Sequence, residues 1–503
     1  MHFATGTAFA LALAAVPYAV VLAAPTSAPV CIVGAGPSGL TVAHGLEVKG
    51  IDAVIFEKAA AAGGKCTAYY DEKGLFHPLG ALLFANETYA NTLPLIDASG
   101  VLATPFTYSF KNWLYEWHTG HVEEQKESIK ATTDRAIFRA QLNKYVDFWN
   151  KEFKPTVSIG YKLPIQERFM DATLTFLIKN GMPLISVLMI EGTVPYGYGS
   201  ILEVPAIYML QYFTPDIMLF FAGQREGYVI DFAAVFVQYA KTLQKTPQYY
   251  NTHITKIDRS GAFPTISYTV AGGDANAQPR VQTCSKIVLA FPPILPALEK
   301  ANLDITDAER SVFAPVSIIK YMSGAVRVLT PDQFLFAGFL RELTIGKIAN
   351  KVNEWFNSVI PGAHLPTEIG YIPFSPKPEG QPTAFVRVHN ASDIATTWSW
   401  GPRGSAITLE DGRTLLKQAL SKINKDPRDS NAKPKPVTDA DVMAFKEHDY
   451  FPHYDNKADL RTKYLEFNRL QGKKNTYYVS GFNGFETVEF AIRAGKDIVQ
   501  SYF

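Results

Sequence analysis

The sequence predicts an α/β fold that begins with a βαβ unit and adds an α+β lobe and a helical cap. A β-branched run over 30–33 precedes a glycine-rich turn and helical spacing up to Lys49, and a second strand pattern follows. A stretch with few charges over 172–221 is interrupted by prolines, which predicts short packed helices. A last strand and a helical pattern over 487–502 close the chain. Because such elements occur at both ends, we expect one sheet assembled from separated segments.

Length and composition favour an enzyme with several lobes. The chain has 503 residues, of which 47% are hydrophobic and 13% aromatic. An aromatic surplus beyond the needs of a core suits a protein that encloses a large, flat, apolar ligand. The formal net charge is +1 and the basic residues are scattered. No feature therefore points to a nucleic-acid partner.

The first residues read as a signal peptide over 1–23. An apolar run over 8–22 ends in Val21-Leu22-Ala23, which fits the rule for signal-peptide cleavage. An uncleaved anchor is the alternative, although Pro17 would disturb a spanning helix. No later stretch is long and apolar enough to span a bilayer, so no stable membrane span is expected.

The predicted location is the secretory pathway, with the protein either secreted or lumenal. Two further features bear on this prediction. Sequons at Asn86 and Asn390 are predicted glycosylation sites. Three cysteines are too few for a disulfide-framed scaffold. Cys31 and Cys284 border apolar strands, and we interpret both as buried small hydrophobic residues rather than reactive groups.

The strongest motif is the glycine fingerprint after the first strand. Gly34 permits a tight turn, Gly36 lets the backbone approach a pyrophosphate, and Gly39 allows close packing of helix on strand. Ser38 lies in the same turn, where the helix N-terminus presents free N–H groups. Glu57 ends the second strand, where its carboxylate can accept bonds from ribose hydroxyls and would repel a 2′-phosphate. These residues predict a GxGxxG-type Rossmann-like dinucleotide site.

Two weaker motifs favour FAD over NAD. Gly63-Gly64-Lys65 forms a turn with a cation that can neutralise a pyrophosphate, although an ordinary loop is an equal interpretation. Near the C-terminus, Gly481 to Gly484 bend the chain before Glu486-Thr487, where a helix can begin. Its first N–H groups would suit the electron-rich edge of a reduced flavin. A plain capped helix stays the alternative there.

The sequence resembles the flavin amine oxidase superfamily, and within it the fungal β-cyclopiazonate dehydrogenase family. The resembling stretches are 30–40, 56–58, 63–65, 287–293 and 486–495. Bacterial polyunsaturated fatty acid isomerases are more distantly similar. The family's doublet usually ends in Arg where this chain has Lys65, and its Glu-Gly-Ala is Glu489-Phe490-Ala491 here. The resemblance implies a non-covalently held FAD, an oxidation by hydride abstraction and a role in secondary metabolism.

The resemblance also implies the cofactor-binding residues. Gly34, Gly36, Ser38 and Gly39 would hold the pyrophosphate. Glu57, followed by Lys58, would hold the adenosine ribose, and Gly64 and Lys65 would lie near the phosphates. Ile254 would pack near the adenine, Val488 would offer its backbone N–H to the flavin, and Glu489 would lie towards the ribityl chain. The expected FAD-binding segments are 29–130, 229–300 and 446–503, with a helical cap over 131–228 and a substrate lobe over 301–445.

The predicted activity is an FAD-dependent oxidoreductase that takes a hydride from a hydrophobic small molecule, with oxygen or another electron acceptor. One alternative is an FAD-dependent double-bond isomerase acting on an unsaturated, lipid-like substrate. A second is a secreted glycoprotein that keeps the fold without the chemistry. No catalytic base can be named. The turn over 194–199 and the stretch 398–401 are candidate pocket walls, with core packing as the alternative.

A metal site is disfavoured. His448, His453 and Asp455 lie close together in the sequence, but packed and surface histidines are the better interpretation. No metal is expected.

Overall fold

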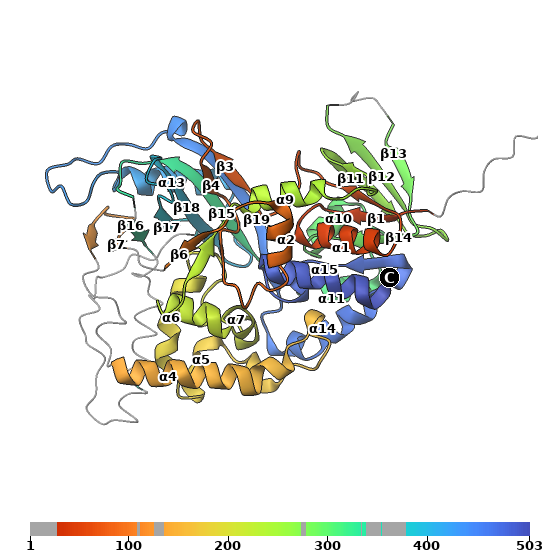
Figure 1. Ribbon diagram of the computed structural model, residues 1–503, viewed down its shortest axis with the longest axis horizontal. Helices are drawn as coiled ribbons and strands as arrows, with labels where there is room; N and C mark the ends of the chain where they lie inside the picture. Colours follow the sequence, from red (N-terminus) through yellow and green to blue (C-terminus); the bar gives the residue numbers. More distant parts are fainter. Residues whose placement is uncertain are drawn as a thin grey trace, which may run out of the picture.

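The computed structural model describes residues 28–107, 111–124, 135–272, 278–332, 334–338, 354 and 379–503. The predicted signal peptide over 1–23 lies outside these residues. In Figure 1 a nucleotide-type sheet lies at the right, a larger sheet at the upper left and a group of helices at the bottom.

A five-stranded parallel sheet confirms the predicted α/β fold. Its order is β10–β2–β1–β14–β20. The strands are β1 (Val30–Val33), β2 (Ala53–Phe56), β10 (Gln248–Tyr249), β14 (Lys286–Leu289) and β20 (Thr476–Tyr478). All residues of β1 and β2 are buried, which matches their continuous apolar runs, since parallel sheets are covered on both faces. The sheet therefore unites strands from both ends of the chain, as the sequence predicts.

Helices α1 (Pro37–Val48) and α15 (Val488–Tyr502) pack closely beside this sheet (Figure 1). A Cβ at Gly45 would meet the Val499 side chain at 2.9 Å, and one at Gly495 would meet the Ser38 backbone at 2.8 Å. Glycine at both positions therefore allows the two helices to approach each other. Helix α1 begins within the glycine-rich turn, because Pro37 has the fixed φ that suits a first helical residue.

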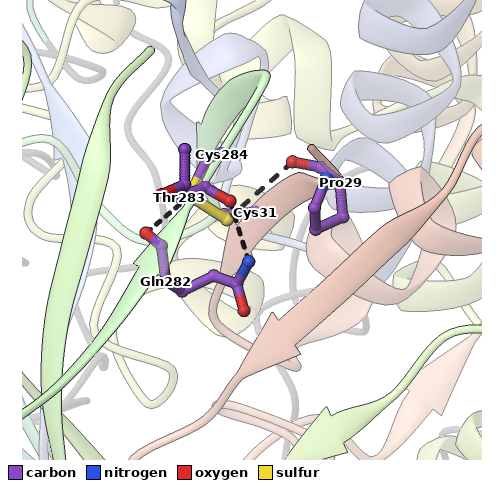
Figure 2. Close-up of a disulfide and its surroundings, with 5 residues drawn as sticks. All are labelled: Pro29, Cys31, Gln282, Thr283 and Cys284. Carbon is purple, nitrogen blue, oxygen red and sulfur yellow. Dashed lines mark hydrogen bonds between the residues drawn. A yellow bond between two sulfur atoms is a disulfide. The ribbon is translucent and has the colours of Figure 1, made fainter. Parts of the chain in front are cut away.

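A disulfide between Cys31 and Cys284 corrects the prediction that both are unbonded hydrophobic residues. Figure 2 shows the bond beside Pro29 and Gln282. Both cysteines are buried, as predicted. The pairing arises because β1 and β14 are neighbours in the sheet, with Cys31 opposite Ile287 and Cys284 just before β14. The 253-residue separation hides this proximity in the sequence.

A seven-stranded sheet forms the second lobe, in the order β19–β15–β18–β17–β16–β7–β8 among the described strands. Its strands are β7 (Lys111–Tyr115), β8 (Val122–Glu124), β15 (Ser317–Arg327), β16 (Phe334–Ala337), β17 (Pro382–Val386), β18 (Ile394–Gly401) and β19 (Val442–His453). Helix α13 (Leu409–Ser421) packs beside β17 and β19. The long antiparallel pair β15–β19 brings this sheet towards the nucleotide-type lobe (Figure 1).

The helical region begins with α4 (Arg135–Phe148), which continues as a π-helical turn over Trp149–Phe153. The prolines and glycines of the following stretch divide it as predicted. The resulting helices are α5 (Thr173–Lys179), α6 (Ser186–Thr193), α7 (Ala206–Tyr212) and α8 (Pro215–Phe221). Among the described residues, no helix combines the length and apolar character needed to cross a bilayer.

Smaller elements connect these lobes. An antiparallel sheet is formed by β11 (Thr252–Asp258), β12 (Thr265–Val270) and β13 (Arg280–Thr283). Short strands are β3 (Ala68–Tyr70), β4 (Phe76–Pro78), β5 (Leu83–Phe84), β6 (Thr104–Phe106) and β9 (Gly227–Val229), and the remaining α-helices are α2 (Leu93–Ser99), α9 (Phe232–Lys241), α10 (Leu295–Lys300), α11 (Asp307–Phe313) and α14 (Lys457–Leu470). Residues 426–436 contain no regular element.

Candidate functional site

The glycine turn after β1 folds tightly against the strand that precedes it and the end of β14. Gly34 has a φ of +113°, and a Cβ there would lie 2.8 Å from the Ala290 carbonyl oxygen. A Cβ at Gly39 would collide with the Gly34 carbonyl oxygen. Both glycines are therefore required by the fold itself.

Gly36 has a different environment, because within 4 Å of a Cβ there the described residues beyond its chain neighbours would offer just the Gly64 Cα, at 3.6 Å. Gly63 donates its N–H to the Ala35 carbonyl (2.9 Å), which lays the second glycine turn onto the first. Gly64 is exposed and has a φ of +57°. Two stretches of bare backbone thus face each other beside the N-terminus of α1.

The N-terminus of α1 suits a diphosphate. Its N-cap Gly36 provides no side-chain cap, and Pro37 carries no N–H. Ser38 and Gly39 therefore supply the first N–H groups of the helix. A helix N-terminus next to backbone without side chains is a binding geometry for phosphate anions. The residues present thus fit the pyrophosphate of a dinucleotide.

Glu57 extends this surface at the end of β2. Its buried carboxylate accepts bonds from the N–H groups of Ala35 (2.7 Å) and Ala59 (2.8 Å). Lys58 is exposed, and half-buried Ile254 lies on β11, which begins where Thr252 donates its N–H to the Glu57 carbonyl. The predicted ribose and adenine residues are therefore adjacent to the glycine turn.

Lys65 contacts the C-terminal segment. Its Nζ lies 3.0 Å from Glu486 Oε2 and 5.3 Å from the centre of the Tyr450 ring. Both members of the ion pair are largely buried. Sequence reasoning assigned Lys65 to the phosphates and missed this ion pair, which joins the glycine doublet to the residues before α15.

The N-terminus of α15 is built by Thr487, whose hydroxyl accepts the N–H of Phe490. Val488 is the first helical residue, so its N–H has no acceptor within the helix. The Glu489 carboxylate is fully engaged by the backbone N–H groups and side chains of Asn91 and Thr92. Any contact of Glu489 with a ribityl chain therefore falls to its backbone. Phe490 packs onto Gly484, which accounts for a large side chain in place of the family's glycine.

An aromatic cluster lies where the cap, the second lobe and the C-terminal segment meet. Tyr450 donates its hydroxyl to Tyr198 (2.9 Å), and Tyr198 donates to the Glu486 carbonyl (2.8 Å). Tyr321 stacks on Tyr450 with ring centres 4.7 Å apart, and Phe485 packs on Tyr198. Burial raises the pKa of Tyr198, Tyr321 and Tyr450 well above the usual range, so these hydroxyls stay neutral.

The two predicted pocket walls do meet each other. Trp400 donates its Nε1–H to the Val194 carbonyl (2.9 Å), and Trp398 packs edge-on against Tyr196. Tyr321 and Tyr450 were missed by sequence reasoning. Alternation along the strand puts His448 and Tyr450 on one face of β19, and Tyr321 shares that face because β15 pairs it with His448.

The other singled-out residues are placed as follows. His453 lies 2.7 Å from Asp455, and His448 lies on β19. Within the described part of the chain, no group of three His, Cys, Asp or Glu side chains has a metal-binding arrangement.

Asn86 and Asn390 are exposed, and their glycosylation stays a prediction. A cavity of about 670 Å³ beside α4 and α5 includes Phe148, Lys179 and Met182 and shares no lining residue with the glycine turn or the aromatic cluster.

Comparison with known proteins supports the fold. Residues 32–98 match the family model of the NAD(P)-binding Rossmann-like domain. An uncharacterised protein of Acanthamoeba polyphaga mimivirus is 22% identical over 94% of this chain and 93% of its own length.

Two solved structures share the whole fold. A fatty acid isomerase from P. acnes, described as producing CLA, has a TM-score of 0.73 at 20% identity and covers 95% of this chain and 99% of its own. A putrescine oxidase bound to putrescine has a TM-score of 0.58 at 13% identity, covering 94% and 98%. At these identities the likeness establishes the fold, which is that of FAD-binding oxidoreductases such as the amine oxidases.

Proposed function

We propose that this chain is an FAD-dependent oxidoreductase that abstracts a hydride from a hydrophobic small molecule. The observation that carries the proposal is the convergence of three segments. The glycine turn after β1 contacts Glu57 and the glycine doublet, and Lys65 of the doublet pairs with Glu486, just before α15. A flavin held by these residues would supply the chemistry, which is the acceptance of a hydride from an activated C–H bond.

The chain's own residues bind the cofactor, orient the substrate and exclude water from the site. Gly36, Gly64 and the first N–H groups of α1 hold the pyrophosphate, and Glu57 holds the ribose. Val488 offers its N–H at the positive end of α15. The cluster of Tyr198, Tyr321 and Tyr450 presents a neutral aromatic wall beside the Lys65–Glu486 ion pair. Such a wall suits an apolar substrate.

We further propose that the protein works in the secretory pathway, carries glycans at Asn86 and Asn390, and serves secondary metabolism with oxygen or another acceptor. The Cys31–Cys284 disulfide supports an oxidising compartment. The exposure of both asparagines is compatible with glycosylation.

The visible spectrum of purified protein, before and after heat denaturation, tests the cofactor. We expect flavin absorption bands and FAD in the supernatant after denaturation, since non-covalent FAD is released on unfolding. A colourless protein that takes up no added FAD would refute the proposal and favour a fold without the chemistry.

A double-bond isomerase acting on an unsaturated, lipid-like substrate is the second candidate. The higher TM-score of the fatty acid isomerase, 0.73 against 0.58 for the putrescine oxidase, favours it. Anaerobic incubation of the holoprotein with linoleic acid and no electron acceptor separates the two. Formation of many isomer molecules per flavin supports the isomerase, whereas an oxidase without an acceptor stops at about one product molecule per flavin.

A further inference from the structure

The Lys65–Glu486 ion pair connects two segments whose backbones are themselves anchored. On the side of the glycine doublet, Gly63 donates its N–H to the Ala35 carbonyl, and the Lys65 carbonyl accepts the N–H of Thr67. These bonds hold the doublet against the glycine turn after β1. The point from which the Lys65 side chain extends is therefore fixed with respect to that turn.

The backbone of Glu486 is anchored as well. Its carbonyl accepts the Tyr198 hydroxyl at 2.8 Å. Gly481 lies directly against it, because a Cβ at Gly481 would meet Glu486 Oε2 at 2.9 Å and its Cα at 3.1 Å. Glu486 precedes Thr487, the N-cap of α15, and Val488 is the first helical residue. A contact that fixes Glu486 therefore also fixes where the first N–H groups of α15 point.

The ammonium group of Lys65 is turned into the protein. Its Nζ is shielded from solvent and lies 3.0 Å from Glu486 Oε2, which is shielded too, and 5.3 Å from the centre of the Tyr450 ring. A phosphate that binds a lysine needs direct access to an N–H of the ammonium. Gly64, one residue earlier, is exposed. The doublet thus presents bare backbone to the outside, whereas its cation is used inside the protein.

The two charges act as a unit. If either partner is neutralised, the other keeps a largely buried charge without its counter-ion, which is more costly than the intact pair. The unit joins a turn that follows the first strand of the sheet to the start of the last helix of the chain. It therefore couples the two places at which a dinucleotide would meet backbone N–H groups.

We propose that the Lys65–Glu486 ion pair positions the flavin end of the cofactor and makes no contact with its pyrophosphate. The pair holds the N-terminus of α15 beside the glycine doublet, so that the N–H of Val488 is oriented before the flavin binds. Lys65 and Glu486 are thus positioning residues, because they act through α15. This inference rests on the proposed function and gives the pair a role within it.

Two ligands separate the positioning role from a phosphate contact. FAD contains the adenosine, the pyrophosphate and the flavin, whereas ADP contains the first two without the flavin. The measurement starts from the flavin-loaded, full-length protein. Release of FAD on dilution gives its dissociation constant, and displacement of FAD by ADP gives that of ADP, both from flavin fluorescence. Loss of a phosphate contact weakens both ligands, whereas a shift of α15 weakens FAD alone.

Lys65→Met and Glu486→Gln should each weaken FAD by about tenfold and leave the dissociation constant of ADP within about twofold of the wild-type value. The double variant should weaken FAD no more than either single change, because the pair acts as a unit. Lys65→Arg keeps the charge and should bind FAD like the wild type. Lys162→Met is the matched control, because it removes an ion pair with Asp497 on the same helix, away from its N-terminus. This control should change neither constant.

A phosphate contact of Lys65 requires a different pattern. Lys65→Met would then weaken ADP as much as FAD, and Glu486→Gln would strengthen ADP because it frees the cation. Either result would overturn the inference, as would unchanged FAD binding in both single variants. Thermal melting shows whether each variant is folded, and if Lys65→Met is not, Glu486→Gln supplies the same comparison. A wild-type protein that carries no flavin and takes up none refutes the proposed function instead.

Discussion

The glycines of the fingerprint differ in what their missing side chains make possible. Gly34 and Gly39 lie against backbone oxygens, so any side chain there would clash with the protein itself. Among the described residues beyond its chain neighbours, a Cβ at Gly36 would meet just the Gly64 Cα within 4 Å, at an ordinary contact distance. Its bare backbone is therefore open to the approach of a ligand, as the proposed pyrophosphate contact requires. Folding and binding are thus assigned to separate positions within six residues.

Gly36→Ala should leave the melting temperature of the cofactor-free protein unchanged, because the added methyl group has room. It should weaken FAD at least tenfold, which is about 1.4 kcal/mol, since the methyl group stands where the pyrophosphate approaches. Fluorescence titration with FAD and thermal melting measure the two effects. Gly39→Ala is the contrasting variant and should lower the melting temperature itself. Wild-type FAD affinity in Gly36→Ala would contradict this assignment.

Removing the disulfide by the double change Cys31→Ala and Cys284→Ala should destabilise the protein by about 2–5 kcal/mol, because the bond closes a very long loop in the unfolded chain. Calorimetry should show a lower melting temperature, and a reductant should then have no further effect. Cys66→Ala is the control, because this buried thiol forms no disulfide. An unchanged melting temperature would mean that the sheet holds β1 and β14 together unaided.

At the scale of elements, continuous apolar runs and prolines predicted β1, β2 and the division of the helical region correctly, since each depends on local sequence. Contacts between distant strands could not be predicted this way. The Cys31–Cys284 bond and the approach of Tyr321 to Tyr450 depend on which strands are neighbours and in which register. Likewise, nothing near Lys65 in the sequence indicates Glu486. The proposed cofactor residues of the glycine turn could be named from the sequence because their motif is local, whereas the aromatic cluster is assembled from three lobes.

A buried ion pair joins the three-stranded sheet to α11 and β20. Arg259 donates to Glu309 at 2.6 and 2.9 Å, and Glu309 also accepts from Thr306. These contacts lower the pKa of Glu309 from its ordinary 4.5 to about 2 despite burial. Because the folded-state pKa is depressed, the stabilisation is fully present above the ordinary pKa and is lost as the pH falls from about 5 to about 2.

Glu309→Gln should therefore destabilise the protein at pH 7 by about 1–3 kcal/mol, because Arg259 loses its buried partner and is left with its ion pair to the partly exposed Asp304. The melting temperature of the variant should also fall less steeply than that of the wild type between pH 5 and the acid limit. Calorimetry across this pH range measures both effects. Glu299→Gln, at an exposed ion pair with Arg310, is the control and should change little. If the melting temperatures of wild type and Glu309→Gln fell equally with decreasing pH, groups other than Glu309 would cause the acid sensitivity.

For the whole molecule, the proposed cofactor site joins segments that lie far apart in the chain. The glycine turns belong to the first 65 residues, β14 ends at Leu289 and α15 begins at Val488. A ligand that binds all of these segments only in the folded state must stabilise them as a unit.

FAD at one hundred times its dissociation constant should thus add about 2.7 kcal/mol to the free energy of unfolding. Adding FAD to cofactor-free protein should raise the melting temperature of a single calorimetric transition. In hydrogen exchange, α15 should become more protected together with β1 and β2. In Gly36→Ala the same FAD concentration should stabilise less. If FAD protected only the residues around β1 and β2, the N-terminal unit would bind alone, and the C-terminal helix would have no part in the site.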